Sequence, residues 1–144
     1  MDGKNKAPFS FTTLSNPEWD KKIEAGLLKE CAALTSSSVT SKTHHIYVKH
    51  DDTFVGGIKF EQHAHILWVD SIWIEPPFRK QGVGRALLQE AHLFAIQNKV
   101  QEMQLNTYFQ EAHTFFLTCG FEDVAVIPNW KWGLTCYLMR KMQL

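Results

Sequence analysis

The sequence predicts a mixed α/β domain in which helices cover a largely contiguous sheet. Segments with the alternating or continuous apolar pattern of strands lie between segments whose apolar residues recur at helical spacing. The 144 residues suffice for one sizeable core, and neither an internal repeat nor a linker divides them. We therefore expect a single domain over residues 1–144.

The N-terminal segment is expected to contain a short strand and a helix. Residues 9–14 alternate like a strand. Asn16 followed by Pro17 is typical of a helix start, with Asn16 as the cap. Apolar residues then recur at helical spacing, namely Trp19, Ile23, Leu27, Leu28, Cys31 and Leu34. Residues 35–43 are rich in Ser and Thr and are expected to form a loop.

Three strands are expected next, over residues 45–49, 54–60 and 65–75, with turns at 50–53 and 61–64. Gly56 and Gly57 indicate a bulge or a close backbone approach in the second strand. The third strand is almost continuously apolar, so it should be central and buried on both faces. By parity, Trp68 should face the core and Trp73 the opposite side. Pro76 and Pro77 end this strand because neither can donate to a ladder.

The remaining chain alternates between helix and strand. An amphipathic helix is expected over residues 83–100, and a short one over 110–119 with Gly120 as its C-cap. Strands are expected over residues 103–108, 121–127 and 134–141.

Composition favours a cytoplasmic protein without a membrane or nucleic-acid partner. The formal net charge is +0, which gives no support for binding a polyanion. Cys31, Cys119 and Cys136 are widely spaced and odd in number, unlike a disulfide framework. Neither a signal segment nor an apolar run long enough to span a bilayer is recognisable.

The glycine-containing segment from Arg79 to Arg85 is the first candidate site. It lies between an apolar strand and an amphipathic helix that begins inside the segment. The free N–H groups of a helix start attract phosphate, and the missing Cβ atoms of Gly82 and Gly84 allow a ligand to approach the backbone. Arg79, Lys80 and Arg85 add positive charge. A diphosphate is the natural ligand of such a segment.

Other readings of this segment are weaker. A P-loop requires Gly-Lys-Ser/Thr after a longer spacing, which is absent. A dinucleotide fingerprint requires a third Gly or Ala where Leu87 stands. A strand-to-helix turn with solvated basic residues remains an alternative.

Two motifs carry a resemblance to a known family. Arg79-x-x-Gly82-x-Gly84, after a strand ending in residues 72–76 and before Arg85-Ala86-Leu87-Leu88, resembles the acyl-CoA loop of the GNAT superfamily of N-acyltransferases. Downstream, Ala112-x-x-Phe115-Phe116-x-x-Cys119-Gly120-Phe121 is similar to the second signature of that family. Residues 105–110 and 137–141 resemble an uncharacterised bacterial subgroup.

The resemblance implies a fold and a co-substrate. The fold would be a mixed central sheet of about six to seven strands, with helices on both faces and a splayed central strand pair. The co-substrate would be acetyl-CoA, and no metal is implied. The cofactor-binding positions would be the backbone of Ile72, Trp73 and Ile74 for the pantetheine arm, the segment Arg79, Lys80, Gln81, Gly82, Val83, Gly84 and Arg85 for the pyrophosphate, and Phe116 beside the thioester.

The implied reaction is direct attack of a primary amine on the acetyl thioester in a ternary complex. The acceptor would be a small molecule or an exposed protein amine. The attacking ammonium must lose a proton, and the leaving thiolate must gain one. Asp70 interrupts an apolar strand close to Ile72 and is the candidate base. A structural role for Asp70, as a cap or backbone acceptor, is an equal alternative.

The sequence departs from the family pattern at two positions. Phe116 stands where the family usually has its tyrosine acid, and Phe109 stands in place of an asparagine. Tyr108, Tyr47 or Tyr137 could substitute, or the thiolate could leave without help. The remaining alternative is a non-catalytic module that binds acyl-CoA in a regulatory role.

Histidine and tryptophan residues suggest further sites. His63 and His65 share a parity that suits two metal ligands, but no third ligand at a recognised spacing completes a site, so surface histidines are expected. Trp130 and Trp132 lie between the last two strands. They could wall an acceptor pocket, form a homodimer contact or simply make an apolar turn.

Overall fold

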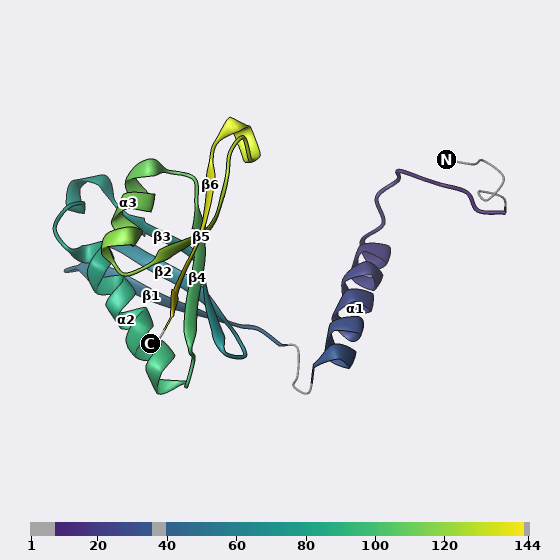
Figure 1. Ribbon diagram of the computed structural model, residues 1–144, viewed down its shortest axis with the longest axis horizontal. Helices are drawn as coiled ribbons and strands as arrows, with labels where there is room; N and C mark the ends of the chain where they lie inside the picture. The colour runs from purple at the N-terminus through teal and green to yellow at the C-terminus, as the bar shows by residue number, and fades with distance from the viewer. Residues whose placement is uncertain (1–7, 36–39, 143–144) are drawn as a thin grey trace. The chain divides into compact units, whose positions relative to one another are not determined.

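The computed structural model describes residues 8–35 and 40–142. It separates into two compact units, one within residues 1–39 and the other within residues 40–144 (Figure 1). The sheet and all elements after the first helix belong to the second unit. One domain over residues 1–144 therefore stays a prediction.

The first unit consists mainly of helix α1, Pro17–Leu34. Its start is the predicted one. The side-chain oxygen of Asn16 accepts hydrogen bonds from the N–H groups of Glu18 at 3.1 Å and Trp19 at 3.3 Å. Together with Pro17 in the first turn, this cap satisfies N–H groups that a helix start leaves free.

The strand predicted at residues 9–14 is wrong. These residues form no strand, and the Leu14 N–H donates instead to Oγ1 of Thr12 at 3.2 Å. A strand requires a neighbour that pairs with its backbone groups. Alternation of apolar and polar side chains in a short segment does not supply that neighbour.

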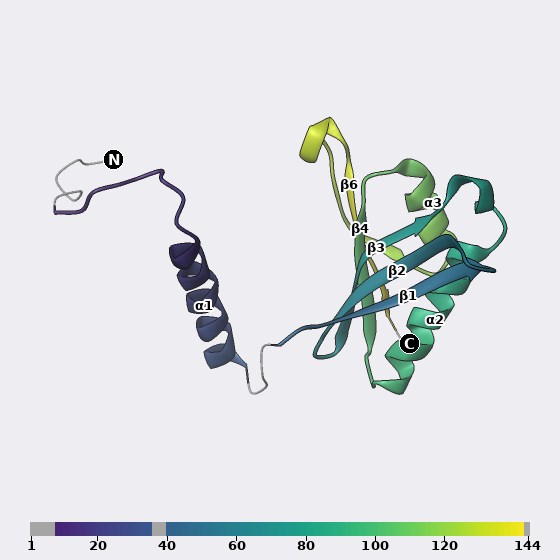
Figure 2. The ribbon, with the colours of Figure 1, turned by 180° about the vertical axis from the view of Figure 1, so that it is seen from behind.

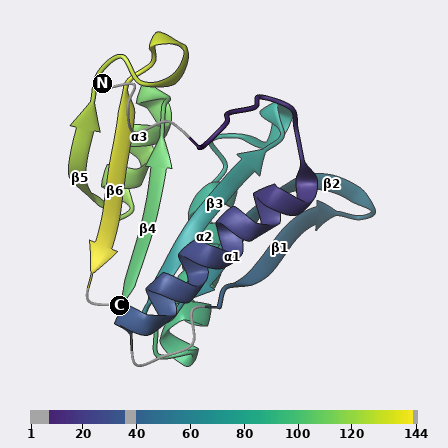
Figure 3. The ribbon, with the colours of Figure 1, turned by 90° about the vertical axis from the view of Figure 1, so that its right-hand side faces the viewer.

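The second unit is built on a mixed sheet. In the described part of the chain it has six strands in the order β1-β2-β3-β4-β6-β5, and only the β3–β4 pair is parallel. Figure 3 shows the strands face on. Their bounds are β1 Lys42–His50, β2 Thr53–His63, β3 Ile66–Ile74, β4 Glu102–Thr107, β5 Glu122–Ile127 and β6 Cys136–Met142.

The first two strands are longer than predicted. Lys42 pairs with Gln62 and Thr43 with Glu61, so the ladder continues through residues assigned to loop and turn. The turn after β2 shrinks to Ala64 and its successor, and Ala64 takes a positive φ of 52°. Backbone hydrogen bonds extend through polar residues as readily as through apolar ones, so polarity alone misplaced these boundaries.

Helices α2, Val83–Gln97, and α3, Gln110–Thr118, lie on the same side of the sheet in both Figure 1 and Figure 2. Helix α2 ends before the predicted residue 100. Lys99 takes a positive φ of 57°, and the side chain of Asn98 donates to the carbonyl of Phe94 at 2.9 Å. A left-handed residue of this kind ends a helix.

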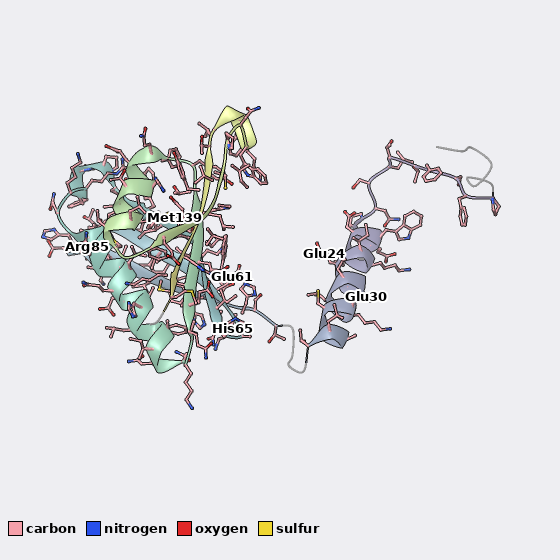
Figure 4. The ribbon with its side chains drawn as sticks, viewed as in Figure 1. Glu24, Glu30, Glu61, His65, Arg85 and Met139 are labelled. Carbon is pink, nitrogen blue, oxygen red and sulfur yellow. The ribbon has the colours of Figure 1, made fainter. Side chains whose placement is uncertain are left out.

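The core lies between these helices and the facing side of the sheet. One cluster of buried residues joins strands β2, β3, β4 and β6 to α2 and α3. Met139 of β6, labelled in Figure 4, is among its fully buried members. The cluster comprises Ile58, Phe60, Leu67, Val69, Leu87, Leu88, Ala91, Ala95, Val100, Met103, Leu105, Phe116, Phe121 and Met139.

Candidate active site

Strands β3 and β4 separate toward their carboxyl ends. Their parallel pairing begins at Ile66 with Glu102 and ends at Trp68 with Gln104. Beyond that point no residue of β4 pairs with β3 in the described chain, and Figure 3 shows the two strands diverging. This is the splayed central pair that the family resemblance implies.

A bulge in β3 lies where the separation begins. Val69 pairs with Phe60 and Ser71 pairs with Lys59, so Asp70 is an extra residue without a partner on β2. A bulge bends its strand and increases the local twist, which directs the end of β3 away from β4. The polar pair Asp70-Ser71 in an apolar run is its only signal in the sequence.

The structure corrects two predictions about β3. Trp68 pairs with Glu61 and Trp73 with Gly57, positions that share one face of β2, so the two tryptophans lie on the same face and Trp68 is not in the core cluster. Burial also alternates along β3 instead of being continuous, because α2 and α3 cover one face only. The inserted residue reverses the parity on which the prediction for the two tryptophans depended.

The diverging edge of β3 presents free backbone groups. The N–H of Glu75 donates to the carbonyl of Val55 on β2 at 2.8 Å. Groups alternate in an antiparallel ladder, so Trp73 also bonds toward β2, while the N–H and C=O groups of Ile72 and Ile74 point toward β4. The Ile74 carbonyl accepts from Nε of Arg79 at 2.9 Å. Within the described residues, the N–H and C=O of Ile72 and the N–H of Ile74 therefore remain available to a ligand.

The loop after β3 ends in an open helix start. A short 3₁₀ helix, Pro76–Phe78, leads into the loop, and Gly82 is the N-cap of α2 with a φ of +84°. The first helical bond runs from the Ala86 N–H to the Gly82 carbonyl at 3.0 Å, so the N–H groups of Val83, Gly84 and Arg85 have no helical acceptor. Beyond its neighbours in the chain, no heavy atom lies within 4 Å of a Cβ built on Gly82. The arrangement is a positively polarised cradle for an anion.

The two glycines of the motif have different roles. A left-handed residue at Gly82 lets the loop enter the helix, and the space beside it is open. A Cβ on Gly84 would instead lie 3.3 Å from Cζ of Phe115, so this glycine permits close packing of α2 against α3. The Gln81 side chain donates to the Pro77 carbonyl at 3.1 Å and braces the loop.

The two arginine side chains of the motif are engaged within the protein. The guanidinium of Arg79 stacks over the Trp73 ring at 4.7 Å from its centroid while it bonds the end of β3. Arg85, labelled in Figure 4, turns to α3 and donates to the hydroxyl of Thr118 at 3.1 Å and to its carbonyl at 3.4 Å. Lys80 is exposed, with a φ of 58°. The cradle therefore depends mainly on backbone N–H groups.

Asp70 lies beside two polar side chains. Its Oδ2 is 3.8 Å from Nζ of Lys59 and accepts from Oγ of Ser71 at 3.3 Å. Both members of the ion pair are almost half exposed, so the carboxylate is open to solvent and to a substrate. Sequence reasoning missed Lys59, which only the cross-strand register brings to Asp70.

Phe116 and the candidate tyrosines have distinct surroundings. Phe116 is buried and packs against Phe115 and Phe121 with ring centroids 5.3 and 5.7 Å away. Tyr47 is largely exposed on β1 and stacks on His45. Tyr108 contacts Trp132 edge to face at 6.3 Å. Phe116 thus provides packing and no ionisable group.

A histidine–aspartate pair joins α3 to the last two strands. Nε2 of His113 lies 2.8 Å from Oδ1 of Asp123, and the imidazole stacks on Tyr137 with centroids 3.8 Å apart. The sequence contained no signal for this arrangement, because its members lie on three different elements. The stacking fixes the ring of Tyr137 against α3.

The remaining histidine and tryptophan residues form simpler contacts. Nε2 of His63 lies 3.0 Å from the carboxylate of Glu61. No group of three potential metal ligands occurs among residues 8–35 and 40–142. Trp130 and Trp132 are exposed on the β5–β6 loop, where Trp132 takes a positive φ of 56°. Their role as an acceptor wall or a homodimer contact stays a prediction.

Comparison with known proteins agrees with this geometry. A family profile described as "Acetyltransferase (GNAT) domain" matches residues 42–123. No curated protein sequence matches the chain. Among solved structures, an acetyltransferase from Bacillus cereus has a TM-score of 0.85 at 17% identity, covering 92% of this chain and 97% of that one.

Two further solved structures share the fold. The ribosomal-protein-S18-alanine N-acetyltransferase from Escherichia coli has a TM-score of 0.65 at 16% identity, covering 80% of this chain and 76% of that one. A Bacillus anthracis protein, provisionally described as a streptothricin acetyltransferase and solved with acetyl coenzyme A, has a TM-score of 0.64 at 16% identity, covering 69% of this chain and 62% of that one.

The chain belongs to the GNAT family of acetyltransferases, since the family profile covers more than half of it. It is therefore an acetyltransferase, and its acyl donor is acetyl-CoA. The family match favours the enzyme over a non-catalytic module. In the described parts of the chain, helices are too short or too polar to cross a membrane.

Proposed function

We propose that this protein transfers the acetyl group of acetyl-CoA to a primary amine by direct attack in a ternary complex. One observation carries the proposal. The diverging edge of β3 leads through the loop into the cradle at the start of α2, so one run of chain has free backbone groups on Ile72 and Ile74 at its start and on Val83, Gly84 and Arg85 at its end. A ligand with amide groups at one end and a diphosphate at the other matches this run.

The residues present fit acetyl-CoA. The N–H and C=O of Ile72 and the N–H of Ile74 would pair with the pantetheine amides, as another strand would. The N–H groups of Val83, Gly84 and Arg85 would hold the pyrophosphate, next to the open space at Gly82. Trp73 supports this site through Arg79 rather than through its own backbone.

Asp70 is the proposed base. Bound acetyl-CoA supplies an activated acetyl thioester. The carboxylate of Asp70, open to solvent in the bulge next to the diverging edge, would accept the proton that the attacking amine must lose, directly or through one water molecule. Lys59 and Ser71 hold this carboxylate in place. Because Phe116 offers no proton, the thiolate would leave unaided or take its proton from solvent.

The proposed acceptor is a small-molecule amine or an exposed amine of a protein. Structures with this fold carry names of both kinds: the Escherichia coli protein is named for an alanine of ribosomal protein S18, and the Bacillus anthracis protein for streptothricin. The exposed rings of Trp130 and Trp132 would suit an acceptor with apolar or cationic surface.

A CoA-release assay over a panel of small amines and N-terminal peptides tests the proposal. We expect release that depends on one class of acceptor. In Asp70→Asn, kcat should fall by roughly a hundredfold or more, with unchanged acetyl-CoA affinity. Asp52→Asn, an exposed turn residue, is the matched control and should keep full activity.

Either of two results would contradict the mechanism. If CoA is released with every acceptor no faster than by thioester hydrolysis, the protein does not transfer acetyl to these amines. If Asp70→Asn and Asp52→Asn have equal kcat, Asp70 is not the base.

A further inference from the structure

A small hollow lies beside helix α2. It has a volume of about 120 Å³ and is formed by the side of α2, the end of α3 and strand β6. Arg85, Gln89 and His92 line it from α2, Thr118 from α3 and Lys141 from β6. Arg85, Gln89 and His92 follow one another at helical spacing, so they form one wall.

The lining is positive. Arg85 and Lys141 both reach the hollow, and among the described residues no Asp or Glu lines it. Within residues 8–35 and 40–142, neither cation has a carboxylate within ion-pair distance. Among the described residues, the hydrogen bonds of the Arg85 guanidinium go to the neutral oxygens of Thr118.

Lys141 is held in the hollow although Arg85 carries the same positive charge. Its Nζ lies 3.3 Å from Nδ1 of His92, and burial followed by the charge of Lys141 lowers the pKa of His92. The stem of Lys141 passes over Gly120, where an added Cβ would lie 3.2 Å from Cε. Gly120, with a φ of +92°, thus gives Lys141 the room to direct its ammonium inward.

We propose that this hollow binds a phosphate group, at a site separate from the cradle at Gly82. A tetrahedral dianion would receive the charge of Arg85 and Lys141 from two sides and hydrogen bonds from His92 and Gln89. Such an anion would balance the positive charge of Arg85 and Lys141. The site goes beyond acetyl transfer, and its occupation requires no turnover.

The test uses inorganic phosphate in a phosphate-free buffer, with ionic strength held constant by chloride. The ring resonances of His92, assigned with His92→Asn, report occupation by NMR, and calorimetry gives the affinity. We expect saturable binding in the millimolar range and a rise in the pKa of His92. Lys141→Gln should weaken binding at least tenfold, whereas the matched control Lys49→Gln, an exposed residue of β1, should not.

Two sources of phosphate are distinguished by competition. If acetyl-CoA displaces inorganic phosphate and 3′-dephospho-acetyl-CoA does not, the 3′-phosphate of the cofactor occupies the hollow. If neither displaces it, free phosphate is the ligand. Both results support a phosphate site in the hollow. Neither result depends on acetyl transfer, so the phosphate site and the proposed function can be refuted independently.

Three results would overturn the site. The first is no shift of His92 with phosphate or acetyl-CoA. The second is equal phosphate affinity in Lys141→Gln and Lys49→Gln. The third is displacement by acetyl-CoA and its 3′-dephospho analogue alike, which would place the phosphate in the cradle. If Lys141→Gln does not fold, the change in the His92 ring resonances on adding phosphate to the unaltered protein still tests whether the hollow binds phosphate.

Discussion

Substitution of Gly82 separates the fold of the cradle from its ligand binding. Gly82 has a φ of +84° with no atom within 4 Å of an added Cβ, so Gly82→Ala meets backbone strain and no steric clash. Gly82→Glu adds a carboxylate at the mouth of the cradle. Gly133 is the matched control, because it has a φ of +72° and its nearest contact, Asn129 Oδ1, lies at an ordinary 3.8 Å.

The expected magnitudes follow from this geometry. A left-handed backbone costs an L-residue roughly 1–2 kcal/mol, so Gly82→Ala and Gly133→Ala should lose about this free energy of unfolding. For a chain of this length that is a fall in Tm of roughly 3–8 °C. Gly82→Glu should be more stable than Gly82→Ala by about 0.3–1 kcal/mol in the free energy of unfolding, because a negative charge stabilises a helix start.

Acetyl-CoA affinity should follow a different order. Gly133→Ala should bind as the unaltered protein does. Gly82→Glu should bind at least tenfold more weakly, which is about 1.4 kcal/mol, because its carboxylate competes for the N–H groups and repels the pyrophosphate. Thermal unfolding gives the stabilities and calorimetric titration the affinities. Unchanged affinity in Gly82→Glu would refute the assignment of the cradle.

Two further substitutions test the sheet and its pH response. In Gly56→Ala the added Cβ would lie 2.5 Å from the Trp73 carbonyl oxygen, so urea unfolding should show a loss of about 3 kcal/mol in the free energy of unfolding. The control Gly26→Ala, whose Cβ would meet nothing within 4 Å, should lose no stability. Equal stability of the two variants would contradict the β2–β3 packing. Burial, more than nearby charge, lowers the pKa of His44 below its ordinary 6.5, so its contribution to stability is present above pH 6.5 and is lost as the pH falls through the folded-state pKa. His44→Phe should therefore reduce the acid slope of the free energy of unfolding by up to about 1.4 kcal/mol per pH unit, and an unchanged slope would contradict this role.

The pH prediction depends on the packing of His44. Its ring lies 5.5 Å from Phe60 and 4.4 Å from Phe94, and its buried Nε2 has no hydrogen-bond partner among the described residues. A protonated ring would carry an unpaired charge there. Phenylalanine fits the same space, so His44→Phe tests titration rather than loss of packing.

Local signals in the sequence predicted what local chemistry controls. The Asn16-Pro17 helix start, the loop around Gly82 and the left-handed turn at Gly120 all follow from the conformational preferences of single residues. The succession of strands and helices along the chain after residue 40 followed from the apolar patterns. These features require no knowledge of distant partners.

The features that the sequence did not predict depend on register. One extra residue, Asp70, reverses the parity of β3 and moves Trp68 out of the predicted core. The engagement of Arg79 with Trp73 and of Arg85 with Thr118 depends on where chain segments meet. Composition indicates neither, since an arginine in a solvated loop and one in a bracing contact look alike in sequence.

The central claim is that acetyl-CoA lies along the diverging edge of β3 and in the cradle of α2. Backbone amide exchange, measured by NMR with and without acetyl-CoA, tests it directly because the site consists largely of backbone groups. We predict that the amides of Ile72, Ile74, Val83, Gly84 and Arg85 become protected, while amides of the β5–β6 loop do not. Binding of acetyl-CoA that leaves these five amides exchanging freely would contradict the claim.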